Sequence, residues 1–272
     1  MSGLAITGAA GYVGSAIGRC FRSHGWEVAE LGRRSARKFE LGGATPVDWT
    51  GIDALVHCAW DFRLTRWEDI LRVNVQGSIR VMEEARNAGV KRGVFISSLS
   101  CFERCRSLYG KGKLVVEQEA ARLGFAIVRP GLVYGDSPGG MMGALEKAVT
   151  SSPVVPLIGD GSSPQYPVHE EDLAALVLAL CQMQQPPAGP ISAAGGEAIP
   201  FRALLARIAA RHGRKPLYLP IPWRLILAGL RTMEWAGLQP PFRSDSLTGF
   251  IFQNPNPDFE VAHGITPFRP FQ

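Results

Sequence analysis

Three glycines separate the first apolar segment of the chain from the first amphipathic helix, and this turn limits the fold more than any other feature. Residues 4–7 predict a buried strand, and residues 12–22 predict a helix. Glycines in such a turn let the backbone approach a pyrophosphate, while the free amides of the helix N-terminus face the anion. The sequence therefore predicts a dinucleotide-binding turn. Its residues are Gly8, Gly11, Tyr12, Val13 and Gly14.

Short apolar strands alternate with helical patterns over the first 130 residues. The expected strands are 4–7, 26–31, 54–58, 94–97 and 126–129, and the expected helices are 12–22, 75–88 and 109–123. Strands spaced by helices indicate repeated βαβ units, and hence an α/β, Rossmann-type doubly wound parallel sheet. No apolar run approaches the roughly 18–20 residues that a membrane span needs. Without a basic leader before an apolar stretch, we expect a cytoplasmic protein.

The last third of the chain has a different composition. Thirteen of the 20 prolines lie at or after Pro186, which predicts short elements joined by turns. We expect a cofactor-binding domain over residues 1–150, to which 168–195 return, and a small mixed substrate-binding lobe over most of 151–272. Within the lobe, helix 223–235 could cover a substrate pocket or lie on a membrane surface.

Basic residues are concentrated in the same region. From residue 201 onward there are nine basic and four acidic residues, whereas the first 200 residues are balanced. Arginine forks match phosphate and carboxylate groups, so an anionic small-molecule substrate is expected, and no nucleic acid. A solvated basic surface explains the excess equally well.

The end of the second strand bears on the choice of cofactor. NAD-binding folds place a carboxylate there for the ribose 2′-hydroxyl, but this chain has Arg33 and Arg34. An arginine there would pair with a 2′-phosphate, which favours NADP, with NAD as the alternative. The competing interpretation is a basic loop whose side chains point to water.

A tyrosine and a lysine share one face of the helix expected at 109–123. Tyr109 and Lys113 are four residues apart, and a nearby ammonium favours the phenolate form of a tyrosine. Ser98, at the end of the preceding strand, could bond a reacting oxygen. These three are the candidate catalytic residues. The alternative is that Lys113 simply pairs with Glu117 one turn on.

Together these features resemble the extended and atypical short-chain dehydrogenase/reductases, which include the NAD(P)-dependent epimerases and dehydratases. The resemblance covers most of the first 180 residues. Its matching segments are 7–14, 53–59, 74–78, 88–92, 95–100, the Tyr109/Lys113 pair, 129–135 and 168–172.

The resemblance implies a role for each matching residue. Tyr109 would be the acid/base, Lys113 would tune it and hold the nicotinamide ribose, and Ser98 would orient the carbonyl. The remaining positions implied to contact the cofactor are Asp48 at the adenine, Cys58, Ala59 and Trp60 at the nicotinamide ribose, and Pro130 and Val133 near the carboxamide. Asn74 would support the active-site helix.

Departures from the family pattern limit the types of reaction that the resemblance implies. Leu99 and Ser100 stand where sugar-nucleotide dehydratases place an Asp-Glu pair, so dehydration is not expected. Residues 165–167, Gln-Tyr-Pro, stand where many nucleotide-sugar members have an arginine for the diphosphate, which weakens a nucleotide-sugar assignment. We expect an oxidoreductase or epimerase that moves hydride between nicotinamide and a secondary alcohol or ketone of a nucleotide sugar. The alternatives are a reductase of an uncharged ketone, such as a steroid or flavonoid, and a dinucleotide-binding sensor or subunit without turnover. A homodimer is one expected assembly.

Several other residues could suggest sites. Cys101 and Cys105 are four residues apart but lack further ligands at metal-binding spacing, so no metal site is expected. His57 is predicted to be a hydrogen-bonded core residue, and His169 to cap the helix that includes Asp172.

Overall fold

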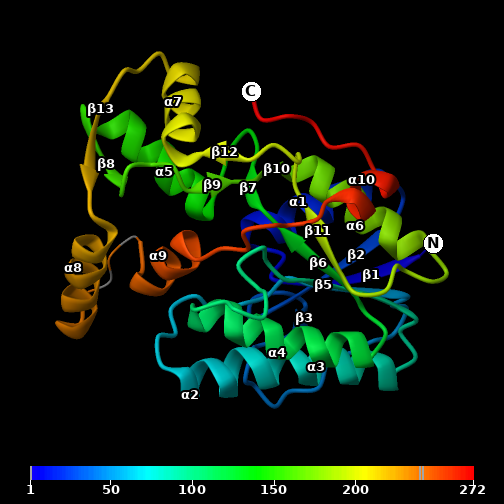
Figure 1. Ribbon diagram of the computed structural model, residues 1–272. Helices are drawn as coiled ribbons and strands as arrows, with labels where there is room; N and C mark the ends of the chain where they lie inside the picture. Colours follow the sequence, from blue (N-terminus) through cyan, green and yellow to red (C-terminus); the bar gives the residue numbers. More distant parts are fainter. Residues whose placement is uncertain (1, 239, 241) are drawn as a thin grey trace.

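A seven-stranded parallel sheet forms the centre of the computed structural model, which describes residues 2–238, 240 and 242–272 (Figure 1). The spatial order of its strands is β11-β6-β5-β4-β1-β2-β3. Their bounds are β1 (Gly3–Thr7), β2 (Glu27–Gly32), β3 (Arg37–Lys38), β4 (Ala54–His57), β5 (Arg92–Ile96), β6 (Ala126–Pro130) and β11 (Pro190–Ala193). Every residue of β1 and β4 is buried, as expected for central strands covered on both faces. The predicted doubly wound fold is confirmed.

Helices cover both faces of this sheet. On one face α1 (Tyr12–Ser23) packs against α6 (Glu170–Gln182), and on the other α3 (Gln76–Asn87) packs against α4 (Leu108–Arg122). A short helix, α2 (Trp67–Asp69), and a π-helical segment, η1 (Ile70–Val75), precede α3. The helical region expected at 75–88 therefore begins earlier, at Trp67, and includes a π-helical segment before the α-helix α3. The chain reverses its progress across the sheet between β1 and β4, and such a switch point forms a crevice at the carboxyl ends of the strands.

A smaller assembly stands beyond those carboxyl ends, with its own buried cluster that includes Leu157, Phe201 and Leu204. It has three two-stranded sheets, β7–β10, β8–β13 and β9–β12. Their bounds are β7 (Leu132–Tyr134), β8 (Val154–Ile158), β9 (Pro164–Gln165), β10 (Pro167–His169), β12 (Ile199–Pro200) and β13 (Leu217–Ile221). The helices of this region are α5 (Gly140–Ser151), α7 (Phe201–Arg211), α8 (Trp223–Trp235) and α9 (Ser244–Ile251).

The end of the chain returns to the main sheet. Helix α10 (Glu260–Ile265) packs against β11 and α6, and Ala262 is buried in the same cluster as Leu4 and Ile6. Most of 151–272 therefore lies beyond the strand ends, but its last helix, α10, packs against the main sheet instead. Within residues 2–238, 240 and 242–272, no helix is long and apolar enough to span a bilayer.

Candidate active site

The glycine turn after β1 forms a cradle whose shape requires residues without a Cβ atom. Gly8 has a φ of 69°, in the left-handed region, and a Cβ there would lie 2.9 Å from the Ala59 nitrogen. A Cβ on Gly14 would collide with the Gly8 carbonyl oxygen. Helix α1 follows with Gly11 as its N-cap and no side-chain cap, so the amides of its first turn have neither an intrahelical nor a capping acceptor. This cradle fits a pyrophosphate group.

Thr7 joins the cradle to the end of β4. Its Oγ1 accepts hydrogen bonds from the amides of Cys58 (3.1 Å) and Ala59 (3.2 Å), and it lies 2.7 Å from His57 Nδ1. The other ring nitrogen of His57 lies 2.8 Å from the Ser78 hydroxyl. Burial, and secondarily the charge of Lys113, lower the pKa of His57 to about 3, so the ring is neutral. His57 is thus a hydrogen-bonded core residue, as predicted, and it fixes the segment that begins at Cys58.

The Tyr109 side chain lies beside that segment. Its ring meets Trp60 edge-on at a centroid distance of 5.6 Å and contacts Phe62 at 5.5 Å. Burial raises the pKa of the Tyr109 phenol well above its usual value, and a side-chain hydrogen bond with Ser98 opposes this only in part. The phenol is therefore protonated at neutral pH. Ser98 therefore lies near enough to the Tyr109 phenol to affect its pKa.

Lys113 lies one helical turn further along α4 and is almost completely buried. Its Nζ donates to the Ile96 carbonyl oxygen at 2.7 Å and lies 4.5 Å from the ring centre of Trp60. Burial lowers the pKa of Lys113 to about 8. The alternative partner, Glu117, instead forms a two-pronged ion pair with Arg129, so the interpretation of a Lys113–Glu117 pair is wrong.

One residue at this site was not anticipated from the sequence. The carboxylate of Asp245, on α9, accepts hydrogen bonds from the backbone amides of Leu108 (2.7 Å) and Tyr109 (2.9 Å). It thereby supplies acceptors to the first turn of α4, where amides lack intrahelical partners. No local pattern could reveal this contact, because 136 residues separate Asp245 from Tyr109.

Asn74 is buried in η1, which packs against the active-site helix α4, and its side chain also holds a loop. Its side-chain oxygen accepts from the Asp61 amide at 2.8 Å, and its nitrogen donates to the Asp61 carbonyl at 3.0 Å. It clamps the loop that carries Phe62 and acts on the active-site helix only through the packing of η1 on α4. The loop that contacts the Tyr109 ring is therefore held from both sides of its backbone.

The residues expected at the adenosine end lie around β2 and β3. Arg33 and Arg34 are exposed just beyond β2, and the nearest ion-pair contact of Arg33, to Glu40, is 3.9 Å long. Asp48 is also exposed; its carboxylate accepts from the Thr50 amide, which lowers the pKa of Asp48. Both arginines are thus accessible at the end of the second strand.

Pro130 ends β6, and Val133 lies in β7, which follows it. The Pro130 carbonyl accepts from the Leu99 amide at 3.1 Å, which places β6 beside the segment that holds Ser98. Val133 pairs with Val168 between β7 and β10.

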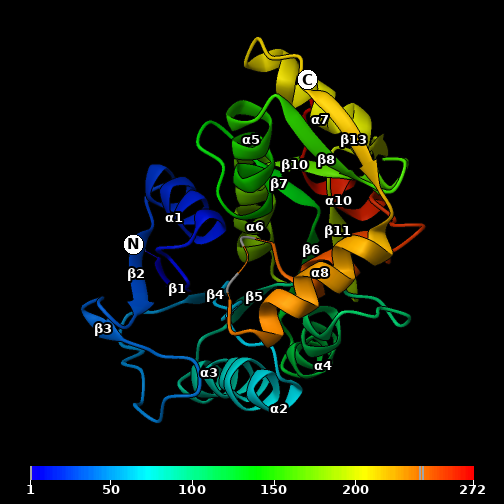
Figure 2. The ribbon, with the colours of Figure 1, turned by 90° about the vertical axis from the view of Figure 1, so that its left-hand side faces the viewer.

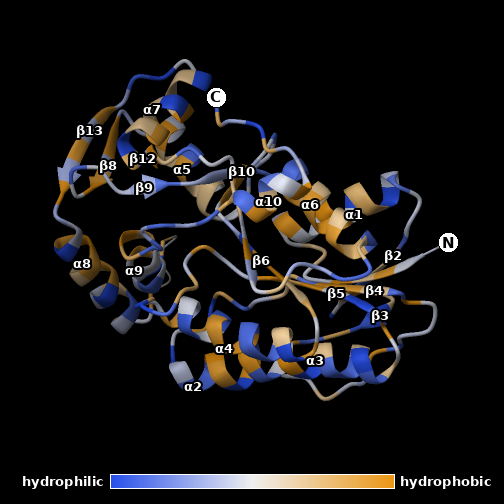
Figure 3. Ribbon diagram, turned by 45° about the vertical axis from the view of Figure 1, so that its right-hand side comes forward, coloured by the Kyte–Doolittle hydropathy of each residue, from blue (hydrophilic) through white to orange (hydrophobic). Residues whose placement is uncertain are grey.

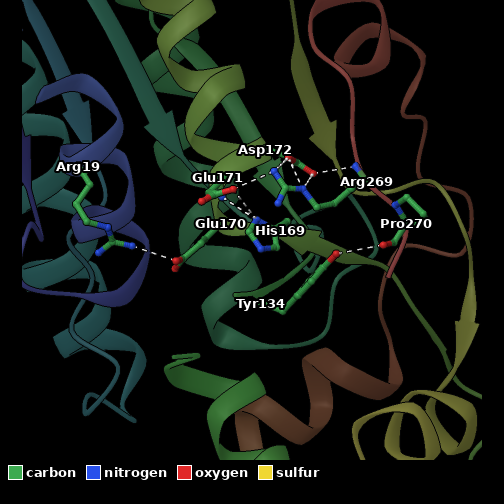
Figure 4. A network of polar contacts seen from close by, with 8 residues as sticks. All are labelled: Arg19, Tyr134, His169, Glu170, Glu171, Asp172, Arg269 and Pro270. Carbon is green, nitrogen blue, oxygen red and sulfur yellow. Dashed lines mark hydrogen bonds and ion pairs between the residues drawn. The ribbon is translucent and has the colours of Figure 1, made fainter. Parts of the chain in front are cut away.

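His169 caps α6, as predicted, because its Nδ1 accepts from the Glu171 amide (Figure 4). In the same network Arg269 binds Asp172 through its amide and guanidinium and also pairs with Glu171. These contacts attach the C-terminal segment to α6. In the part of the chain that the structure describes, no group of three His, Cys, Asp or Glu side chains is arranged to hold a metal ion.

Sequence comparison relates the chain to known proteins. Residues 4–193 match the sequence model of the NAD dependent epimerase/dehydratase family. A ceramide reductase of Caulobacter vibrioides is 29% identical over 252 residues, which cover 86% of this chain and 78% of the relative. A dTDP-4-dehydro-6-deoxy-D-allose reductase of Streptomyces bikiniensis is 25% identical over 285 residues, covering 84% and 87% of the two chains.

Among solved structures, MoeE5 in complex with UDP-glucuronic acid and NAD shares the fold. It superimposes with a TM-score of 0.76 at 21% identity, over 99% of this chain and 95% of MoeE5. At this identity the likeness establishes the architecture.

Proposed function

Because the chain belongs to the NAD-dependent epimerase/dehydratase family, whose members are NAD(P)-dependent epimerases and reductases, we propose that it reduces a ketone to a secondary alcohol. When bound, the nicotinamide supplies the hydride. Tyr109 donates the proton to the carbonyl oxygen, Ser98 donates a hydrogen bond to the same oxygen, and the Lys113 ammonium stabilises the phenolate that remains.

The observation that carries this proposal is the grouping of Tyr109, Lys113 and Ser98 beside the end of β4. The Tyr109 ring packs edge-on against Trp60, the buried Lys113 ammonium lies over the same Trp60 ring, and Ser98 lies near the phenol. A reductase needs a protonated acid beside the carbonyl, and the raised pKa of the Tyr109 phenol keeps it protonated at neutral pH. The presence of all three catalytic side chains favours an enzyme over a sensor without turnover.

The cofactor is proposed to lie across the crevice between β1 and β4. The turn from Gly8 to Gly14 would hold the pyrophosphate, with Tyr12 and Val13 contributing amides at the start of α1. The other proposed cofactor contacts are Arg33, Arg34 and Asp48 at the adenosine end and Cys58, Ala59, Trp60, Tyr109, Lys113, Pro130 and Val133 at the nicotinamide end. In this arrangement residues 1–150 and 168–195 bind the cofactor, and the assembly beyond the strand ends selects the substrate.

For the substrate, we propose an uncharged ketone with an apolar portion. Part of the arginine excess that favoured an anionic substrate is paired within the protein: Arg207 pairs with Glu197, Arg243 with Glu234, and Arg269 with Asp172. The side chains that pack on the Tyr109 ring are aromatic, and one of them, Phe62, is 66% exposed. The likeness to a ceramide reductase over most of the chain supports the same substrate class.

A nucleotide-sugar substrate is the second candidate. It is favoured by the name of the Streptomyces relative, a dTDP-sugar reductase, and by the UDP-glucuronic acid in the MoeE5 complex. Epimerisation of such a sugar would return the hydride to the same molecule. It would therefore leave the nicotinamide unchanged overall.

A substrate panel tests the proposal. The purified protein is incubated with NADPH or NADH and either apolar ketones, including long-chain 3-keto compounds and flavanones, or 4-keto nucleotide sugars. We expect stoichiometric loss of nicotinamide absorbance with at least one apolar ketone, and none with the nucleotide sugars. Turnover of nucleotide sugars alone, or epimerisation without net loss of NAD(P)H, would contradict this substrate class.

NADP is the proposed preferred cofactor, since Arg33 and Arg34 are accessible where a 2′-phosphate would lie. Arg33→Ala should weaken NADPH binding about tenfold or more, the loss expected for one charge-assisted contact, while NADH binding changes little. Titration of both cofactors by calorimetry measures the two losses. Arg104→Ala, at an exposed arginine beyond β5 and outside the proposed cofactor contacts, provides the control. Equal losses for NADPH and NADH in Arg33→Ala would refute the assignment.

A further inference from the structure

Helix α8 is apolar on two faces, and the protein covers only one of them. None of its 13 residues is buried. Its inner face packs against α9, where Trp223 meets Phe252 edge-on at 5.6 Å. The outer face holds Leu225, which is 65% exposed, and Trp235, which is 90% exposed. An apolar helix face is normally covered by a partner.

The apolar surface continues onto the two-stranded sheet that precedes α8. Val154 of β8 and Leu217 of β13 are neighbours in register and both exposed, as are the next pair on that face, Pro156 and Leu219. Residues between them, such as Val155 and Leu157, turn inward. The sheet and α8 lie together on the side of the molecule that faces the viewer in Figure 2, and Figure 3 colours much of both as apolar. We call these exposed residues the apolar face; they are Val154, Pro156, Leu217, Leu219, Leu225, Met233, Trp235 and Leu238.

The exposed charges of residues 214–238, which contribute most of the apolar face, are of one sign. Residues 214–238 contain Arg214, Lys215, Arg224 and Arg231, all exposed, and a single acidic residue, Glu234. Glu234 does not offset them at the surface, because its carboxylate is turned inward and binds Arg243 together with the amide and hydroxyl of Ser244.

We propose that the apolar face docks on an anionic lipid bilayer, with α8 lying in the interface. Apolar side chains, an exposed tryptophan and flanking arginines are the chemistry that enters a headgroup region. A second copy of the chain fits less well. A twofold interface through α8 would bring Arg224 and Arg231 of both copies into one contact region, without an exposed carboxylate in residues 214–238 to pair with them.

The bilayer contact would place the loop that carries Phe62 and contacts Tyr109 close to the lipid. Arg243, which binds Glu234 of α8, also donates to the carbonyl of Arg63, next to Phe62. The C-terminal end of α8 is thus joined through one side chain to the loop that contacts Tyr109. Docking itself does not depend on the proposed reaction and is measured without turnover.

Sedimentation with vesicles tests docking. The full chain is mixed with vesicles of phosphatidylcholine containing phosphatidylglycerol, or of phosphatidylcholine alone. We expect stronger binding to the anionic vesicles, and a loss of at least tenfold in the partition coefficient for Leu225→Glu/Trp235→Glu. Arg224→Glu/Arg231→Glu should lose about fivefold or more per charge on anionic vesicles only. The control is Val261→Glu on α10, at a residue that is 45% exposed and away from the apolar face; it should bind as the unchanged protein does.

Two results would overturn the proposal. One is the absence of binding to anionic vesicles, and the other is binding that survives Leu225→Glu/Trp235→Glu. A dimer in solution that dissociates in the same double variant would assign the apolar face to a second copy instead. Thermal melts of each variant confirm folding, and because all the substituted side chains are exposed, the melts should agree with that of the unchanged protein.

Discussion

Tyr109→Phe should lower kcat for ketone reduction by about 10²–10⁴-fold, the contribution typical of a positioned general acid. The substitution removes only the hydroxyl that bonds Ser98. The aromatic contacts of the ring with Trp60 and Phe62 remain, so the fold and the crevice should be unaffected. Dinucleotide affinity should therefore change less than threefold. Steady-state rates and fluorescence titration of the cofactor measure the two quantities separately.

Tyr218→Phe is the matched control for this prediction. Its hydroxyl is buried without a hydrogen-bond partner on β13, so removing it should leave kcat unchanged. If Tyr109→Phe retained most of the turnover, Tyr109 would not be the proton donor. If it lost the cofactor as well as turnover, the phenol would have a binding role and the assignment of an acid would lack support.

Arg129→Met should reduce the free energy of unfolding by about 3–5 kcal/mol, the usual effect of removing one partner of a buried ion pair. The Arg129 guanidinium donates to both carboxylate oxygens of Glu117, whose side chain is only 4% exposed. Without the arginine, that carboxylate would remain buried beside Cys101 and must either stay charged without a partner or take up a proton. Urea denaturation at pH 7 measures the loss.

Two further variants test this explanation. Arg122→Met removes an exposed arginine that pairs with Glu119 and Glu83, and should cost less than about 1 kcal/mol. The double variant Arg129→Met/Glu117→Leu should recover much of the lost stability, because it leaves no buried charge. An Arg129→Met protein as stable as Arg122→Met would show that the pair contributes little.

Much of the main sheet was predictable, because its signals are local. Glycines 8, 11 and 14 between a strand and a helix, and the apolar runs at β4 and β5, carry their own periodicity. Helix α8 was bounded correctly at residues 223–235 for the same reason. Three strands of two residues each, β3, β9 and β12, were not predicted, because none is long enough to show an alternating pattern.

The site was predictable only where spacing along the chain reflects spacing in space. Tyr109 and Lys113 share a helix face, so their proximity follows from helix geometry. The partners of Glu117 and Lys113 could not be predicted. A carboxylate four residues from an ammonium is an obvious ion pair, but in the buried site Lys113 donates to the Ile96 carbonyl and Glu117 pairs with Arg129. The arginine count of the lobe is a limited guide to the substrate for a related reason, since a sequence does not reveal which charges are paired within the fold.

The contact of Asp245 with the first turn of α4 has a consequence for engineering this protein. Position 245 belongs to the region proposed to choose the substrate, yet its carboxylate holds the backbone of the residue proposed to donate the proton. A chimaera that borrowed α8 and α9 from a relative would exchange specificity and, without an acceptor at that position, would also release the catalytic helix. Selectivity and chemistry therefore cannot be redesigned as independent modules here.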